Sequence, residues 1–155
     1  MSTTVTWIAL VAKDLAAYLV AEQLDALRTE ALGEGQADPF SEIAPDVINL
    51  VRAYIASNPN NLVSTAPLLI PPELKLDVTY LIIAPLLGRL GISLTKDQSD
   101  ALARAHSTLI ALREKKLLVS KPDDAVAPPV QGSTGVTLVS AGGRKTSSAA
   151  LDSLL

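Results

Sequence analysis

One uncharged apolar stretch constrains this chain more than any other feature of its sequence. Residues Glu73–Gly91 read ELKLDVTYLIIAPLLGRLG, and no charge occurs from Val78 to Leu87. The apolar residues do not keep to one face of a helix of 3.6 residues per turn, so a helix formed here must be buried all round. Because one small domain rarely surrounds a helix completely, neighbouring subunits are a candidate source of the remaining cover.

Length and composition bound the class of protein. The chain has 155 residues, 48% of them hydrophobic, which suits one domain with a core of its own. A formal net charge of −3 argues against a protein whose main task is to neutralise nucleic-acid phosphates. The absence of cysteine excludes disulfides and thiolate metal sites. The N-terminus lacks signal-peptide features and the apolar stretch is too short to span a bilayer, so we expect a soluble protein made in a cytoplasm, with no membrane partner.

Two helices are predicted before the apolar stretch. Residues 13–32 carry apolar side chains at spacings of three and four, with an interruption at Val20-Ala21 that leaves two short helices open. The next helix begins near Asp38-Pro39, a capping residue followed by a proline whose missing N–H costs nothing in the first turn. Pro45 either kinks this helix or moves its start to Ala44.

A further helix is predicted after the apolar stretch, at residues 96–117. Thr95 and Gln98 have the spacing of a capping box, in which each side chain accepts a hydrogen bond from the backbone N–H of the other residue. The residues expected to pack in the core or between subunits lie on this helix and on the apolar one: Leu76, Tyr80, Ile83, Leu87, Leu102, Leu109 and Leu112.

The composition changes after Val119. Residues 120–134 form a linker of prolines and small residues, and Gly135–Ser140 alternates like a short strand. We therefore predict an all-α fold: a small bundle of about four helices in residues 1–118, followed by an extended C-terminal arm, residues 119–155, that carries a short β-strand. The arm has too little apolar surface to fold by itself, so we expect it to lie against its own core or a neighbouring chain.

No catalytic, cofactor-binding or metal-binding residues are predicted. His106 is the only histidine, and without cysteine it lacks partners for a zinc site, so we expect it at the surface or an interface. The sequence AGGRKT at residues 141–146 lacks the spacing of a phosphate-binding loop. Asp123-Asp124 lacks the alternating oxygen ligands of a calcium loop. We expect a protein that is not an enzyme.

The order of the parts resembles a known family. Its elements are the helix at Lys13-Asp14-Leu15, the helix end at Val51–Ile55, the crossing at Pro67–Pro72, the apolar helix, the helix at Asp97–Leu117, Gly135–Ser140, Gly143–Thr146 and Leu151–Leu155. In this layout the chain resembles the head–tail connector (adaptor) proteins of tailed bacteriophages, above all their Mu-like branch. Members of that branch end in a similar Val-Ser-containing segment, a basic spot and a short leucine-containing terminus. The chain differs from them at Asn58–Thr65, where relatives carry an Arg-Tyr pair.

The resemblance implies a structural protein of the virion neck. Such proteins form a homo-oligomeric ring, commonly dodecameric, that joins the capsid portal to the tail or stopper and surrounds the channel through which DNA passes without specific binding. They assemble in the host cytoplasm and serve genome packaging and ejection. The arm residues expected to contact the portal or a neighbouring subunit are Val136, Leu138, Val139, Arg144, Lys145, Leu151, Leu154 and Leu155.

A different class of function stays open beside this one. The alternative hypothesis is a small helical regulatory or nucleic-acid-binding protein, in which Lys96–Lys116 reads the DNA. Binding to duplex DNA that weakens with salt would favour it.

Overall fold

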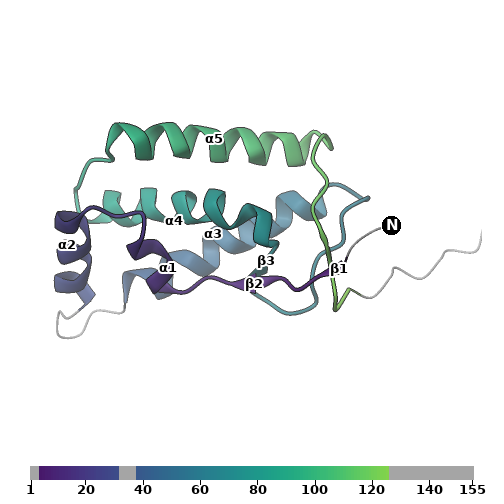
Figure 1. Ribbon diagram of the computed structural model, residues 1–155, viewed down its shortest axis with the longest axis horizontal. Coiled ribbons are helices and arrows are strands. Elements are labelled where there is room, and N and C mark those ends of the chain that lie inside the picture. The colour runs from purple at the N-terminus through teal and green to yellow at the C-terminus, as the bar shows by residue number, and fades with distance from the viewer. Residues whose placement is uncertain (1–3, 32–37, 126–155) are drawn as a thin grey trace, which may run out of the picture.

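The computed structural model describes residues 4–31 and 38–125, which fold into a helical body (Figure 1). Three long helices form its centre: α3 (Pro39–Ala56), α4 (Lys75–Arg89) and α5 (Lys96–Arg113). Figure 1 shows α5 above α4, with α3 running behind and below α4. The shorter helices are α1 (Ala12–Ala16), α2 (Ala21–Ala31) and the 3-10 helix η1 (Pro72–Leu74), which leads directly into α4.

In the described part of the chain, four two-residue strands accompany the helices, so the fold is largely helical, as predicted, but it is not all-α. β1 (Thr4–Val5) pairs in parallel with β4 (Lys121–Pro122), and β2 (Ile8–Ala9) pairs antiparallel with β3 (Leu69–Ile70). The strands form where extended segments lie side by side, because backbone groups removed from water need hydrogen-bond partners. Segments this short cannot show the alternation that predicts a strand. The strand predicted at Gly135–Ser140 lies outside the described residues.

α4 is the central helix, and the chain itself covers most of it. The helix packs against α3, α5 and α1. Val78, Ile82, Ile83 and Leu87 have no exposed surface. A helix that is apolar nearly all round is therefore buried within one chain, and its burial does not call for neighbouring subunits.

One predicted packing residue of α4 is exposed instead. Leu76 keeps 45% of its surface in water, so it does not belong to the core. Leu76, Tyr80 and Ala84 follow each other at intervals of four residues and so lie on one face of α4. Tyr80 and Ala84 are half-buried, so this is the face that the neighbouring elements cover least. Tyr80 packs against Tyr18, with 5.6 Å between the ring centroids. The other predicted residues lie in or against the core: Ile83, Leu87, Leu109 and Leu112 are buried and Leu102 is half-buried.

The helix starts follow local signals in the sequence. The segment 13–32 forms two short helices and not one long one: α1 ends at Ala16 and α2 begins at Ala21. The interruption at Val20-Ala21 in the sequence had left this arrangement open. Asp38 caps α3 as predicted, accepting a hydrogen bond from the Phe40 N–H at 3.1 Å. The alternative start at Ala44 is wrong, because α3 runs from Pro39 through Pro45 without a break.

α5 begins as predicted but ends earlier. The Gln98 N–H donates to the Thr95 hydroxyl at 3.3 Å and the Thr95 N–H donates to the Gln98 amide oxygen at 3.0 Å, which completes the capping box. The helix ends at Arg113 because Lys115 adopts a left-handed conformation with φ of 61°. The Lys116 N–H then reaches the Ala111 carbonyl at 2.9 Å, the closure of a Schellman turn. Glycine usually marks this turn, so a lysine here gave no signal in the sequence.

The contrast between two α4 positions gives a test of the core. Ile82→Ala should lower the free energy of unfolding by about 3 to 4 kcal/mol, because it leaves a cavity in a fully buried site. Leu76→Ala should lower it by less than about 1 kcal/mol, because its side chain is already half in water. Urea denaturation of both variants measures the two losses. Equal losses would show that α4 is not buried in the way described.

Candidate interaction site

The chain after α5 forms a strap, residues 117–125, that is tied to the body along its length. In Figure 1 it leaves the end of α5 and runs down across the molecule to β1. Its first anchors are two buried asparagines, Asn58 and Asn61, whose side-chain amides both donate to the Leu117 carbonyl at 3.4 Å. The Val119 N–H donates to the Asn61 side-chain oxygen at 3.1 Å. These contacts turn the chain back onto the body directly after the helix.

Ser120 is held from two sides. The indole N–H of Trp7, a residue only 3% exposed, donates to the Ser120 carbonyl at 3.1 Å. The Ser120 hydroxyl donates to a Glu73 carboxylate oxygen at 2.9 Å, and the Ser120 N–H donates to the other oxygen. The N-terminal segment and the start of η1 thus fix the same strap residue.

Asp124 closes the strap onto the loop before β3. One of its carboxylate oxygens accepts from the Ser64 hydroxyl at 2.7 Å, from the Thr65 N–H and hydroxyl at 2.9 and 2.8 Å, and from the Ala66 N–H at 3.2 Å. These donors, with Ser64 foremost, lower the pKa of Asp124 from 3.8 to about 2. Asp123 beside it accepts a hydrogen bond from the Thr6 hydroxyl at 3.0 Å. The acidic pair therefore binds the body of its own chain.

Arg52 holds the same loop from the inner side. Its guanidinium donates to the Ser64 carbonyl at 2.7 Å and to the Leu69 carbonyl at 2.6 Å. The guanidinium carbon lies 5.8 Å from the centre of the Trp7 ring, within the range of a cation–π contact. Burial lowers the pKa of Arg52, and the charge of Asp124 opposes that effect. Trp7, Arg52 and Asp124 together link the N-terminal segment, α3, the loop and the strap.

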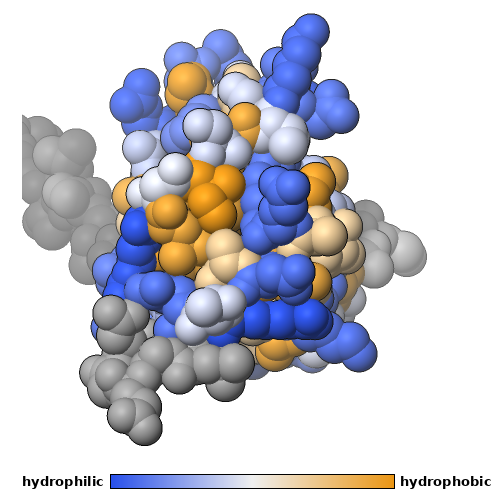
Figure 2. All heavy atoms as spheres, turned by 90° about the vertical axis from the view of Figure 1, so that its left-hand side faces the viewer, coloured by the Kyte–Doolittle hydropathy of each residue, from blue (hydrophilic) through white to orange (hydrophobic). Residues whose placement is uncertain are grey.

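A second feature lies where α1, α2 and the start of α3 meet. These elements, with Leu86 of α4 below them, form an apolar groove of about 330 Å³. Figure 2 faces this end of the molecule and shows hydrophobic surface bordered by hydrophilic side chains. The groove is lined by Ala12, Leu15, Ala16, Leu19, Leu24, Leu27, Phe40 and Leu86, and its charged lining residues are Lys13, Arg28 and Asp38.

Two polar contacts hold the helices around this groove. The buried side-chain amides of Gln23 on α2 and Gln98 on α5 donate to each other, at 3.1 and 2.8 Å. On the other side, the Lys75 ammonium of α4 lies 2.8 Å from the Asp14 carboxylate of α1, and this hydrogen bond is the main cause of the lowered pKa of Asp14. The walls of the groove are therefore tied to α4 and α5.

A wider hollow beside the strap has mixed polarity. Its volume is about 580 Å³, and it is lined by Val5, Asn60, Leu62 and strap residues 118–121. Leu118 at this hollow is 63% exposed. The hollow lies near the point where the described chain ends, on the side of β1 and the strap.

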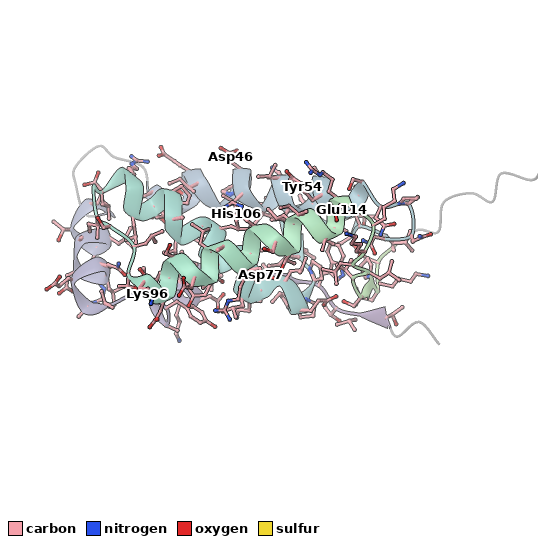
Figure 3. All side chains as sticks on the ribbon, turned by 90° about the horizontal axis from the view of Figure 1, so that it is seen from above. Asp46, Tyr54, Asp77, Lys96, His106 and Glu114 are labelled. Carbon is pink, nitrogen blue, oxygen red and sulfur yellow. The ribbon has the colours of Figure 1, made fainter. Side chains whose placement is uncertain are left out.

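His106 is exposed on α5, at the surface as predicted, and Figure 3 shows it between Lys96 and Glu114, which mark the two ends of that helix. Within residues 4–31 and 38–125, no three histidine or acidic side chains gather in a way that could hold a metal ion. The exposed face of α5 mixes Lys96 and Arg104 with Asp97 and Asp100, so it does not present the uniformly basic surface typical of a DNA-reading helix.

The structure brings together different residues from those that the sequence singled out. The predicted arm residues, from Val136 to Leu155, lie outside the described part of the chain. The strap and the groove escaped prediction because their partners are distant in sequence; Thr6 and Asp123, for example, are 117 positions apart. No helix in the described residues is long and apolar enough to cross a membrane.

Comparison with protein-family models, with curated proteins and with solved structures gives no significant match. The resemblance to phage head–tail connectors therefore stays a prediction from the sequence.

Acid titration tests the role of Asp124. Because its pKa in the folded state is about 2, below its ordinary 3.8, its hydrogen bonds stabilise the fold above 3.8 and are lost as the pH falls towards 2. Asp124→Asn should therefore lower the urea midpoint at pH 6, and its difference from the parent chain should shrink between pH 4 and pH 2.

Asp123→Asn is the matched control for this titration. Asp123 accepts one exposed hydrogen bond, whereas Asp124 accepts four, so the control should lose less stability at pH 6. A midpoint difference for Asp124→Asn that stays constant from pH 6 to pH 2 would contradict the described role of the carboxylate.

Proposed function

We propose that this protein is a non-enzymatic structural adaptor of a tailed-phage virion. In this proposal a homo-oligomeric ring sits in the neck, joins the capsid portal to the tail or stopper, and surrounds the DNA channel. The order of sequence elements, from the helix at Lys13 to the leucine-containing terminus, supports the assignment. The proposal places the arm, residues 119–155, at the contact with the portal or with an adjacent subunit.

The anchored strap is the structural observation that carries the proposal furthest. Contacts from Asn61, Trp7, Glu73 and Ser64 hold the chain from Leu117 to Asp124, so the remaining C-terminal residues start from a defined point on the body. An arm that links two proteins transmits position only if its root is fixed. A helical body with a fixed arm root suits a connector better than it suits an enzyme, which needs a constellation of reactive groups.

The charge of the chain fits a wall along a DNA channel. A net charge of −3 gives a mildly acidic protein, and like charge keeps DNA from adhering to a surface that it must slide past. The protein would then act on DNA by enclosing it and not by reading it, in agreement with the mixed charges on α5.

Deleting Gly135–Leu155 tests the proposal. The shortened chain should keep its helical circular-dichroism spectrum, because α1 to α5 and the strap precede the deletion. It should no longer be captured by capsids that carry the cognate portal protein, while the full chain is captured.

A substitution variant of full length controls for chain length. Val136→Ser, Leu138→Ser and Val139→Ser together remove the apolar side chains of the predicted strand but keep the linker, and this chain should also lose capture. Undiminished capture of the folded, tail-deleted chain would refute the arm as the joining element.

A further inference from the structure

The groove between α1, α2 and α3 has the properties of a docking site. Its volume of about 330 Å³ falls within the range of roughly 300–1,000 Å³ in which ligand pockets lie. Its floor is the fully buried Leu86, and Leu19, Leu24, Leu27 and Phe40 are half-buried along its walls. These apolar lining residues accept branched aliphatic side chains and offer no hydrogen-bond partner to a polar one.

The charges at the groove select among apolar ligands. Lys13 and Arg28 are exposed lining residues on two different walls, α1 and α2. The third charged lining residue, Asp38, already accepts a hydrogen bond from the Phe40 N–H. The Arg28 guanidinium lies 3.9 Å from the Asp25 carboxylate, but both side chains are exposed, and such a surface pair contributes little and leaves Arg28 able to pair with a ligand. An apolar ligand with a negative charge at one end therefore complements this groove better than a neutral or basic one.

The segment Leu151–Leu155 has that chemistry. It reads Leu151-Asp152-Ser153-Leu154-Leu155. Leucines at positions i, i+3 and i+4 share one face of a helical turn, the spacing by which short helices anchor in grooves. Asp152 supplies negative charge beside them.

We propose that the groove receives the segment Leu151–Leu155 of a neighbouring copy, with the leucines in the groove and the Asp152 carboxylate beside Lys13 and Arg28. This inference rests on the proposed homo-oligomer and its arm, and it names where the arm of one copy meets the next. It does not depend on which proteins lie above or below the ring.

The positions of the two ends allow a contact between copies. The strap ends at Ala125 on the side of β1, whereas the groove lies at the end occupied by α2 (Figure 1). Residues 126–150 can span roughly 80 Å when extended, at about 3.3 Å per residue, so an arm can reach the next molecule. A contact between opposite ends of two copies is heterologous, and repetition of such a contact closes a ring when the rotation allows it.

Peptide binding tests the groove directly. The receptor is the full chain with Leu151, Leu154 and Leu155 each changed to Ser, so that its own terminus does not compete. The probe is a fluorescent peptide of residues 147–155, SSAALDSLL, followed by anisotropy. Saturable binding is expected, and the same peptide with its three leucines changed to serine should not bind.

Charge variants distinguish binding in this groove from nonspecific hydrophobic binding. Arg28→Glu in the receptor should weaken binding about tenfold, which corresponds to about 1.4 kcal/mol. Thr29→Glu adds a negative charge at the next residue of α2, outside the groove lining, and should change binding far less. No binding of SSAALDSLL, or equal weakening by both variants, would overturn the assignment. Arg28 and Thr29 are both exposed, so neither variant threatens the fold.

Sedimentation of the unmodified chain establishes whether docking occurs between copies. The unmodified chain should sediment as oligomers at concentrations where the chain with the three leucine-to-serine changes is a monomer. An unmodified chain that is a monomer and does not bind the added peptide, while the leucine-to-serine chain binds it, would show that the terminus folds back onto its own groove and would overturn the contact between copies.

The outcome is distinguishable from failure of the proposed function. If SSAALDSLL does not bind but deletion of Gly135–Leu155 still abolishes capture by portal-bearing capsids, the groove assignment fails and the adaptor stands. If the peptide binds but the full chain is not captured by those capsids, the groove stands and the adaptor proposal fails.

Discussion

The burial of α4 is the constraint on which the rest of this structure depends. A helix with apolar side chains on nearly every face is stable in water only when other elements cover it, because the removal of that surface from water is the main favourable term in folding. α3 and α5 cover two of its sides, and α1 packs on it as well. The loops, short strands and strap lie where they do because they complete or hold this cover.

Hydrogen bonds that span long distances in sequence hold the covering segments. Trp7 reaches Ser120 across 113 positions, and Asp124 reaches Ser64 across 60. Burying polar groups without partners costs free energy, and no buried side-chain nitrogen or oxygen in the described residues lacks one. These hydrogen bonds hold the two ends of the body to each other and to the loop at Ser64. They explain how a segment as polar as Lys121–Asp124 stays in place.

Local signals predicted the helix starts well, and the errors fall where the sequence carries no such signal or where tertiary packing decides. Asp38 and the pair Thr95 and Gln98 mark helix starts through residues two or three positions away, so the sequence displays them directly. The end of α5 at a left-handed Lys115 has no such mark. Leu76 looked like a core residue because hydrophobicity alone does not tell which line of an apolar helix stays uncovered.

The functional features divide in the same way. The order of elements suggested a connector with an arm, whereas the strap, with Asp124 bound to the loop at Ser64–Ala66, and the groove beside Leu24 arise only when distant segments fold together. In the proposed ring, the strap fixes the start of the arm on one copy, and the groove of the next copy binds the end of that arm.

The mass of the native assembly tests the proposed ring. Native mass spectrometry of the full chain, measured alone and then with the cognate portal protein, counts the copies in each complex. We expect a closed assembly on the portal with several copies of 16.2 kDa each and one dominant stoichiometry. A single copy of 16.2 kDa in both measurements would show that no ring forms.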